Sequence, residues 1–276
     1  MPVTAADFEY VRRIVADDSA LALRDGKEYL VRTRLEPVAK REGLGSVAEL
    51  IDRLRGGAPE LRRQVVEALV THETTFFRDA HPFDALREQV IPALWRENGG
   101  RRLSLWSAAT STGQEAYSIA ILIREHFPEI TTPTILATDI SDPVLMRARK
   151  ARFSQLEVGR GLPVALLLKH FDQHGREWQL HDEVRNMVTF HQLNLARPLP
   201  RIASMDVVFL RNVLIYFDAC AKAALLERVS RILRPGGYLF LGGAESICGL
   251  EASYERVQIG RSISYRRLDR QEVGTR

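Results

Sequence analysis

Cysteine is scarce in this chain, with only Cys220 and Cys248 among 276 residues, and the two are not at CxxC spacing. The sequence therefore predicts neither a disulfide scaffold nor a zinc site. Long apolar runs are also missing, so no helix is expected to cross or insert into a membrane. The first ten residues show no basic segment followed by an apolar run. We therefore expect no secretory signal and a cytoplasmic location.

The excess of positive charge is small, with a formal net charge of +4. Such an excess can favour an acidic partner, although arginines scattered over a solvated surface explain it equally well. No basic tract interleaved with aromatic residues is present, so a nucleic-acid partner is not expected. Hydrophobic residues make up 45% and charged residues 27% of the chain, which is typical of a packed globular protein.

The first part of the chain shows only helical patterns. Apolar residues recur at helical spacing over 4–17, 27–42, 46–55 and 59–71. Thr4 precedes Asp7, and Ser46 precedes Glu49, at the spacing of a capping box. Gly56, Gly57 and Pro59 end the third pattern. We predict a small all-helical domain over residues 1–70.

The rest of the chain alternates between strand and helix patterns after a helix over 82–97. Short apolar runs predict strands at 103–106, 134–138, 188–194, 205–210 and 238–242, with helices at 113–126, 142–151 and 218–233. Such alternation predicts a Rossmann-like α/β domain over 71–276, built on a parallel sheet covered on both faces. The tail, 254–268, predicts an antiparallel pair at one edge. Short polar segments predict an inserted antiparallel β subdomain at about 170–187.

Ligands of parallel sheets bind beyond the carboxyl ends of the strands. The loop 107–115 after the first strand is small and polar, but it is neither a GxGxxG loop nor a Walker loop. Asp139 ends the second strand and can accept hydrogen bonds from ribose hydroxyls. Asn194 ends the third strand, where an amide can read adenine, and Arg211 and Asn212 end the fourth. A ribose-binding acid without a pyrophosphate loop indicates an adenosine ligand that carries no phosphate, such as S-adenosylmethionine.

Three longer strings resemble one family. The segment 106–118, WSAATSTGQEAYS, is similar to the WSAACSTGEEPYS of chemotaxis-receptor glutamate methyltransferases, the CheR family. The segment 211–217, RNVLIYF, is the same as that family's string, and 71–79, THETTFFRD, is similar to TNETxFFRD. The strings keep the family's order and spacing from the helical domain to about residue 268. The sequence is therefore identified as resembling the CheR family over nearly its whole length.

The resemblance implies a function and a set of site residues. It implies methyl transfer from S-adenosylmethionine to glutamate carboxylates of methyl-accepting chemoreceptors, which are acidic helical bundles, with S-adenosylhomocysteine as the second product. Arg78 and Tyr216 would lie nearest the transferring methyl group as catalytic residues, and no metal is implied. The cofactor would be bound by His72, Thr74, Arg78, Glu115, Asp139, Asn194, Leu195, Arg211 and Asn212. Among these, Glu115 would bind its ammonium end, Asp139 the ribose, and Asn194 and Leu195 the adenine. We expect a monomer.

Three positions depart from the family pattern. His72 replaces an asparagine and can still donate one hydrogen bond. Gln114 replaces a glutamate, which leaves Glu115 as the binding acid. The β insertion between Phe171 and Val184 is short. Some family members grip a C-terminal receptor peptide with a longer loop there, so we expect no such tether in this chain.

The absence of an obvious general base fits this chemistry. A glutamate side chain has an ordinary pKa of about 4.3 and is already ionised at neutral pH. The cofactor supplies the reactivity, and the protein has to align oxygen, carbon and sulfur. A nucleic-acid methyltransferase and a non-enzymatic module on a methyltransferase fold are the alternatives. The first would bind RNA or DNA in a salt-dependent way, and the second would not bind the cofactor.

A histidine cluster and a basic cluster can each be interpreted as ordinary surface residues or as a functional site. His170, His174 and His181 could suggest a metal, but surface histidines are the better interpretation of such loose spacing. A basic group could be a solvated face, although we favour docking of the acidic receptor slightly; its members are Arg32, Arg34, Lys40, Arg41, Arg53, Arg55, Arg62 and Arg63.

Overall fold

The computed structural model describes residues 3–100, 102–247 and 249–269, so the last seven residues of the domain predicted over 71–276 lie outside the described residues. The chain forms two compact units. The first comprises the chain up to Thr71 together with 194–198 and 216–222. The second comprises 72–193, 199–215 and the described residues from 223 onward. Among the described residues, no helix has both the length and the apolarity to span a bilayer.

Four helices make up most of the first unit: α1 (Ala5–Ser19), α2 (Glu28–Arg41), α3 (Val47–Arg55) and α4 (Pro59–Leu69). The capping box at the start of α1 is confirmed, since the Thr4 hydroxyl accepts from the Asp7 amide and the Asp7 carboxylate accepts from the Thr4 amide. Ser46 caps α3 by accepting from the Glu49 amide. The Glu49 carboxylate, however, accepts from the amide of Gly45 rather than of Ser46, so this second box is only half formed.

The helices of the first unit pack around one apolar core. The residues at helical spacing on their inner faces are buried, and burial of such side chains stabilises each helix more than its intrinsic propensity does. The core includes Phe8, Val11, Val15, Val31, Leu35, Val38, Leu50, Ile51, Leu54, Leu61, Val65 and Leu69. The predicted all-helical N-terminal domain is confirmed.

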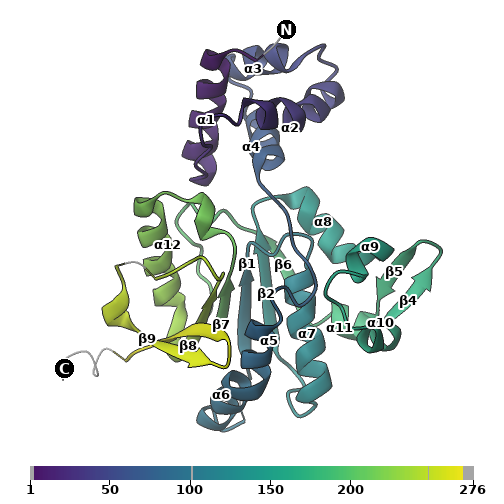
Figure 1. The fold of residues 1–276 in the computed structure, drawn as a ribbon, viewed down its shortest axis with the longest axis vertical. Helices are drawn as coiled ribbons and strands as arrows, with labels where there is room; N and C mark the ends of the chain where they lie inside the picture. The colour runs from purple at the N-terminus through teal and green to yellow at the C-terminus, as the bar shows by residue number, and fades with distance from the viewer. Residues whose placement is uncertain (1–2, 101, 248, 270–276) are drawn as a thin grey trace. The chain divides into compact units, whose positions relative to one another are not determined.

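A seven-stranded sheet forms the centre of the second unit (Figure 1). Its order is β6 (Val188–Gln192), β2 (Thr134–Asp139), β1 (Ser104–Ala108), β7 (Met205–Leu210), β8 (Leu233–Leu241), β10 (Ser262–Arg267) and β9 (Tyr254–Ile259). The first five strands are parallel, and β10 runs antiparallel to both of its neighbours. The Rossmann-like sheet and its antiparallel edge are confirmed.

The chain leaves the middle of this sheet in two directions. From β1 it proceeds to β2 and β6, while β7 and β8 lie on the other side of β1. Right-handed crossovers then place α7 (Gln114–His126) and α8 (Asp142–Lys150) on the opposite face from α12 (Ala219–Ile232), as Figure 1 shows. The strand order reverses between β1 and β7, so the loops after these strands flank the crevice where such sheets bind ligands.

The single helix expected over 82–97 is divided into three pieces without a break in the chain. They are α5 (His81–Ala85), a π-helical turn η1 (Leu86–Val90) and α6 (Ile91–Glu97). Pro92 explains the change, because it has no amide to donate to the carbonyl four residues earlier. The amide of Ile91 bonds instead to the carbonyl of Leu86, five residues earlier.

The inserted subdomain is a three-stranded antiparallel sheet in the order β3 (Arg152–Ser154), β5 (Glu177–Leu180), β4 (Phe171–His174). It also contains α9 (Gln155–Val158), α10 (Val164–His170) and α11 (Asp182–Arg185). The polar segment 182–185 is helical rather than extended, with acidic residues in the first turn, which favour a helix N-terminus. Figure 1 shows this subdomain beside α7 and α8.

Candidate active site

The loop between β1 and α7 is tightly folded at the rim of the sheet. Ala109, Ser111 and Gly113 have positive φ angles of 58°, 55° and 92°. A side chain on Gly113 would lie 3.1 Å from Tyr117 and 3.2 Å from Ala148, so the close packing of this loop on two helices requires glycine. Left-handed residues are uncommon outside glycine and cluster at functional sites, which marks this loop as a site candidate.

Asp139 ends β2, as predicted, and the residue is buried, with 4% of its surface exposed. One carboxylate oxygen accepts from the Ser111 amide at 2.8 Å, and the other accepts from the Ser141 amide at 3.1 Å. The Nδ1 atom of His72 lies 3.7 Å from the second oxygen. A carboxylate has about four acceptor positions, so two fixed amide donors orient it and leave capacity for ribose hydroxyls.

A buried ion pair joins the first turn of α7 to the loop after β7. Arg211 Nη1 lies 3.0 Å from Glu115 Oε2, and the Arg211 side chain is only 1% exposed. Ser107 donates its hydroxyl to the other Glu115 oxygen at 2.8 Å. Burial raises the pKa of the Glu115 carboxyl, while the Arg211 guanidinium and the Ser107 hydroxyl hold it below what burial alone would give.

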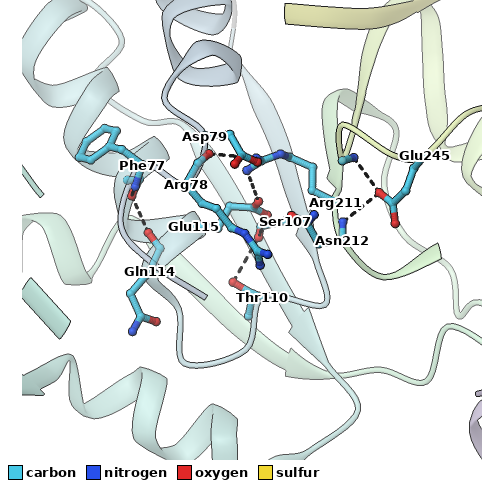
Figure 2. A network of polar contacts seen from close by, with 12 residues as sticks. Phe77, Arg78, Asp79, Ser107, Thr110, Gln114, Glu115, Arg211, Asn212 and Glu245 are labelled. Atoms are coloured by element: carbon cyan, nitrogen blue, oxygen red, sulfur yellow. Dashed lines mark hydrogen bonds and ion pairs between the residues drawn. The ribbon is translucent and has the colours of Figure 1, made fainter. Parts of the chain in front are cut away.

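The second guanidinium nitrogen of Arg211 bonds to the segment that precedes α5. It donates to the Arg78 carbonyl at 2.9 Å and to the Asp79 carboxylate at 2.6 Å. In Figure 2 the Arg211 side chain lies between Glu115 and Asp79. Arg211 thus connects three segments that are far apart in the sequence.

The segment 72–80 follows a strained path past this ion pair. Phe77, Asp79 and Ala80 have positive φ angles of 46°, 68° and 48°. The Phe77 amide donates to the Ser118 hydroxyl of α7 at 2.9 Å, which fixes the segment on that helix. Arg78 is half-buried and donates to the Glu73 carbonyl at 3.1 Å. The structure therefore brings Arg78 close to the Glu115–Arg211 pair through the main chain.

Two other predicted residues belong to the same segment. Thr74 is half-buried. The main-chain carbonyl of His72 accepts from the Ser111 hydroxyl at 2.7 Å, so the start of the segment is bonded to the loop after β1. The second unit thus contains His72, Thr74, Arg78, Glu115, Asp139, Arg211 and Asn212.

The remaining predicted residues belong to the first unit, namely Asn194, Leu195 and Tyr216. The Asn194 amide nitrogen donates to the Asp18 carbonyl, and its oxygen accepts from the Ala196 amide at 2.9 Å. Leu195 is buried, and the half-buried Tyr216 packs against the helical core. Their roles toward the adenine and the methyl group stay predictions.

Sequence reasoning missed two acids at the rim. Asp79 receives the hydrogen bond from Arg211, and Glu245 accepts from the Asn212 amide at 2.9 Å. Glu245 follows the end of β8. Its place could have been predicted by the same rule that pointed to Asp139 and Arg211, namely that polar residues after parallel strands meet at one edge of the sheet. Asp79 offered no such signal, because its partner is 132 residues away in the chain.

The histidine cluster holds no recognisable metal site. Among the described residues, no group of three or more His, Cys, Asp or Glu side chains is placed to hold a metal ion. The prediction of surface histidines is wrong for His170, which is buried with its Nε2 atom 2.7 Å from Glu125 Oε1. Burial lowers the pKa of His170, and Glu125 partly offsets this effect.

Comparison with known families matches both parts of the chain. The all-alpha domain of the CheR methyltransferases matches residues 6–70, and their S-adenosylmethionine-binding domain matches residues 72–263. With a sheet of this order and an acid at the end of its second strand, the chain is an S-adenosylmethionine-dependent methyltransferase.

Similar proteins narrow this class. A chemotaxis protein methyltransferase 1 from Pseudomonas aeruginosa is 39% identical over 96% of this chain and 99% of its own length. A chemotaxis protein methyltransferase, Cher2, from Pseudomonas putida is 39% identical over 94% of this chain and 97% of its own. The chain belongs to the CheR methyltransferase family. A solved O-methyltransferase family protein from Burkholderia thailandensis is similar to this chain with a TM-score of 0.42 at 16% identity, over 79% of this chain and 63% of that one.

Proposed function

We propose that this chain methylates glutamate side chains of methyl-accepting chemoreceptors and thereby acts in chemotaxis. The observation that carries the proposal is the membership of both parts of the chain in the CheR family, together with relatives named chemotaxis protein methyltransferases that match nearly end to end. The reaction joins a carboxylate oxygen to the methyl carbon as the carbon–sulfur bond breaks. The products are a glutamyl methyl ester and S-adenosylhomocysteine.

The rim residues fit such a cofactor chemically. Asp139 is an oriented carboxylate at the end of β2, which suits ribose hydroxyls, and Glu115 is a second acid, which suits the ammonium of the methionine part. The loop between them lacks the glycine and lysine spacing that binds phosphates, so a phosphate-free adenosyl compound is the better match. We assign the adenine to Asn194 and Leu195 on the resemblance alone.

The chain's own residues have an orienting task. A receptor glutamate arrives ionised, so no residue has to remove a proton from it. We assign Arg78 to orienting that carboxylate by a charge-assisted hydrogen bond, and Tyr216 to positioning it through its hydroxyl. Fixing reacting atoms in line can lower a barrier by roughly 7–11 kcal/mol in favourable cases.

A labelling experiment tests the proposal. The purified chain is incubated with S-adenosylmethionine labelled with tritium in the methyl group and with membranes of the source bacterium that contain its chemoreceptors. We expect label on a receptor-sized band that is released as methanol by mild base, as a methyl ester requires. Base-stable label, or label on nucleic acid, would contradict the proposal.

We also propose that receptor binding does not use a tethered C-terminal peptide. The hairpin of β4 and β5 turns at Gly175, and each of its two strands has four residues. A fluorescent peptide with a receptor's last residues should show no saturable change in anisotropy on titration with the chain. Saturable binding at micromolar concentration would contradict this part of the proposal.

A further inference from the structure

Glu245 is bonded to two different loops at the rim of the sheet. Its Oε2 atom accepts from the Asn212 amide at 2.9 Å and from the Gly242 amide at 2.7 Å. Its Oε1 atom accepts from the Ile215 amide at 3.2 Å. One carboxylate therefore binds three main-chain N–H groups, two of which belong to the 211–215 loop after β7.

The main chain around Glu245 is shaped for this contact. A side chain on Gly242 would lie 2.7 Å from Glu245 Oε2 and 3.0 Å from the Asn212 nitrogen, so only glycine allows the approach. Asn212 has a φ angle of 58°, a conformation that costs free energy unless its surroundings hold it. The hydrogen bond that the Asn212 main-chain amide donates to Glu245 acts at this strained residue.

The 211–215 loop is thus fixed from two sides. The Arg211 side chain is held by Glu115 and Asp79, as described above. The Asn212 and Ile215 amides are held by Glu245, and Figure 2 shows Glu245 beside Asn212 and on the other side of it from Glu115. Charge-assisted hydrogen bonds of this kind are about twice as strong as neutral ones.

We infer that Glu245 is a positioning residue for methyl transfer. It holds the 211–215 loop that carries Asn212, so it sets the place of one proposed cofactor contact. This inference rests on the proposed function for the reaction it serves. A displacement of about 1 Å at a reacting group can cost about a hundredfold in rate, so a residue that only holds main chain can control turnover.

The variant Glu245→Gln separates the contacts of Oε2, with Asn212 and Gly242, from the contact of Oε1 with Ile215. A glutamine has one acceptor oxygen, which can still serve Asn212 and Gly242, but its NH2 group would face the Ile215 amide donor. We expect kcat for receptor methylation to fall by about tenfold or more, with the KM for S-adenosylmethionine within about threefold of wild type. Glu245→Ala removes all three contacts and should also weaken S-adenosylhomocysteine binding by about tenfold in calorimetry.

Glu251→Gln is the matched control. Glu251 is exposed and accepts from the Gly249 amide at 3.1 Å, so it is another acid bonded to main chain, away from the rim loops. This variant should keep wild-type kcat, KM and affinity. Thermal melting of all variants identifies any loss of activity or affinity that follows from unfolding.

The outcomes are distinct. If both Glu245 variants turn over and bind like Glu251→Gln, or lose activity only in proportion to the unfolded fraction, the inference is wrong. If Glu245→Ala does not fold, the kcat of Glu245→Gln alone tests the inference, and a wild-type kcat would contradict it. If the wild-type chain binds S-adenosylhomocysteine but methylates no glutamate, the proposed function fails, and the order of affinities among the variants still decides whether Glu245 positions the loop.

Discussion

Glu115 and Arg211 illustrate how single residues set the charge of the site. Burial raises the pKa of the Glu115 carboxyl above its ordinary value, with Arg211 and Ser107 opposing the shift. A carboxyl with a raised pKa takes up a proton on folding in the pH window between its unfolded and folded values. Its contribution to stability therefore falls as the pH rises through that window.

This shift predicts a pH-dependent affinity for the cofactor product. The cofactor's ammonium would favour ionised Glu115, so binding of S-adenosylhomocysteine should tighten as the pH rises through the Glu115 pKa and should release a proton near that pH. Calorimetry in two buffers of different ionisation enthalpy, at a series of pH values upward from the ordinary glutamate pKa, measures the released proton. Glu115→Gln should abolish the release, and a wild-type chain that releases none would rule out this role.

Arg78 and Tyr216 are predicted to act on turnover more than on binding. Arg78→Ala and Tyr216→Phe each remove one group that would orient the receptor carboxylate, so we expect kcat to fall by roughly ten- to a hundredfold. Steady-state methylation assays give kcat and KM for both variants. Near-normal turnover of either variant would remove that residue from the mechanism.

Local patterns predicted some site residues better than others. Asp139, Arg211 and Asn212 could be found because each follows a strand, and the ends of parallel strands meet at one edge. The partners of Arg211 could not be found this way, since Glu115 lies 96 residues away and Asp79 lies 132 residues away. Such pairs are created by the tertiary fold, and no local pattern encodes them.

Among the elements, the loop between β1 and α7 depends on Gly113, the residue that precedes the helix. At Gly113, a φ of +92° and neighbours at 3.1–3.3 Å leave no room for a side chain. Gly113→Ala should cost about 1–3 kcal/mol of unfolding free energy and should weaken S-adenosylhomocysteine binding, because Ser111 and Glu115 lie in or beside this loop.

The control for this loop is Gly175→Ala. Gly175 also has a positive φ, +64°, but nothing lies within 4 Å of an added side chain. Gly175→Ala should lower the free energy of unfolding by less than Gly113→Ala does. It should leave the affinity for S-adenosylhomocysteine unchanged. Urea unfolding and calorimetry compare the two, and equal losses in both variants would show that close packing at Gly113 has no special role.

Element types were predicted better than element limits. The succession of strands and helices along the second unit could be predicted from alternating apolar runs. The predicted bounds of β7, 205–210, are also the observed ones. β8 was expected at 238–242 but begins at Leu233, since Leu233 pairs with Met205 of β7 across an irregularity in the register. The early start of β8 depends on pairing with the neighbouring strand β7. The sequence Arg234-Pro235-Gly236 has no strand pattern from which this start could be predicted.

For the whole molecule, the helical first unit offers the basic surface expected to meet the receptor. Arg32 is exposed, with its side chain at 60% exposure. Arg34, in contrast, is bonded within the unit, where it donates to the carbonyls of Leu69 and Val70. The docking hypothesis therefore rests on Arg32 and not on Arg34.

Reversal of charge at Arg32 tests this surface. Arg32→Glu should slow methylation of receptor membranes, with a defect that is large at low salt and small at high salt, because exposed charges are screened. Arg256→Glu, which reverses an exposed charge on β9, should have little effect. Equal rates for the two variants at every salt concentration would exclude docking through Arg32.

The nature of the methylated atom is the most direct test of the whole account. A purified receptor signalling domain is incubated with the chain and S-adenosylmethionine, digested, and analysed by tandem mass spectrometry. We predict a single added methyl group on glutamate side-chain oxygens, which is lost after treatment with mild base. A methyl group on a nitrogen, or none on any glutamate of a receptor that the source bacterium's membranes do methylate, would contradict it.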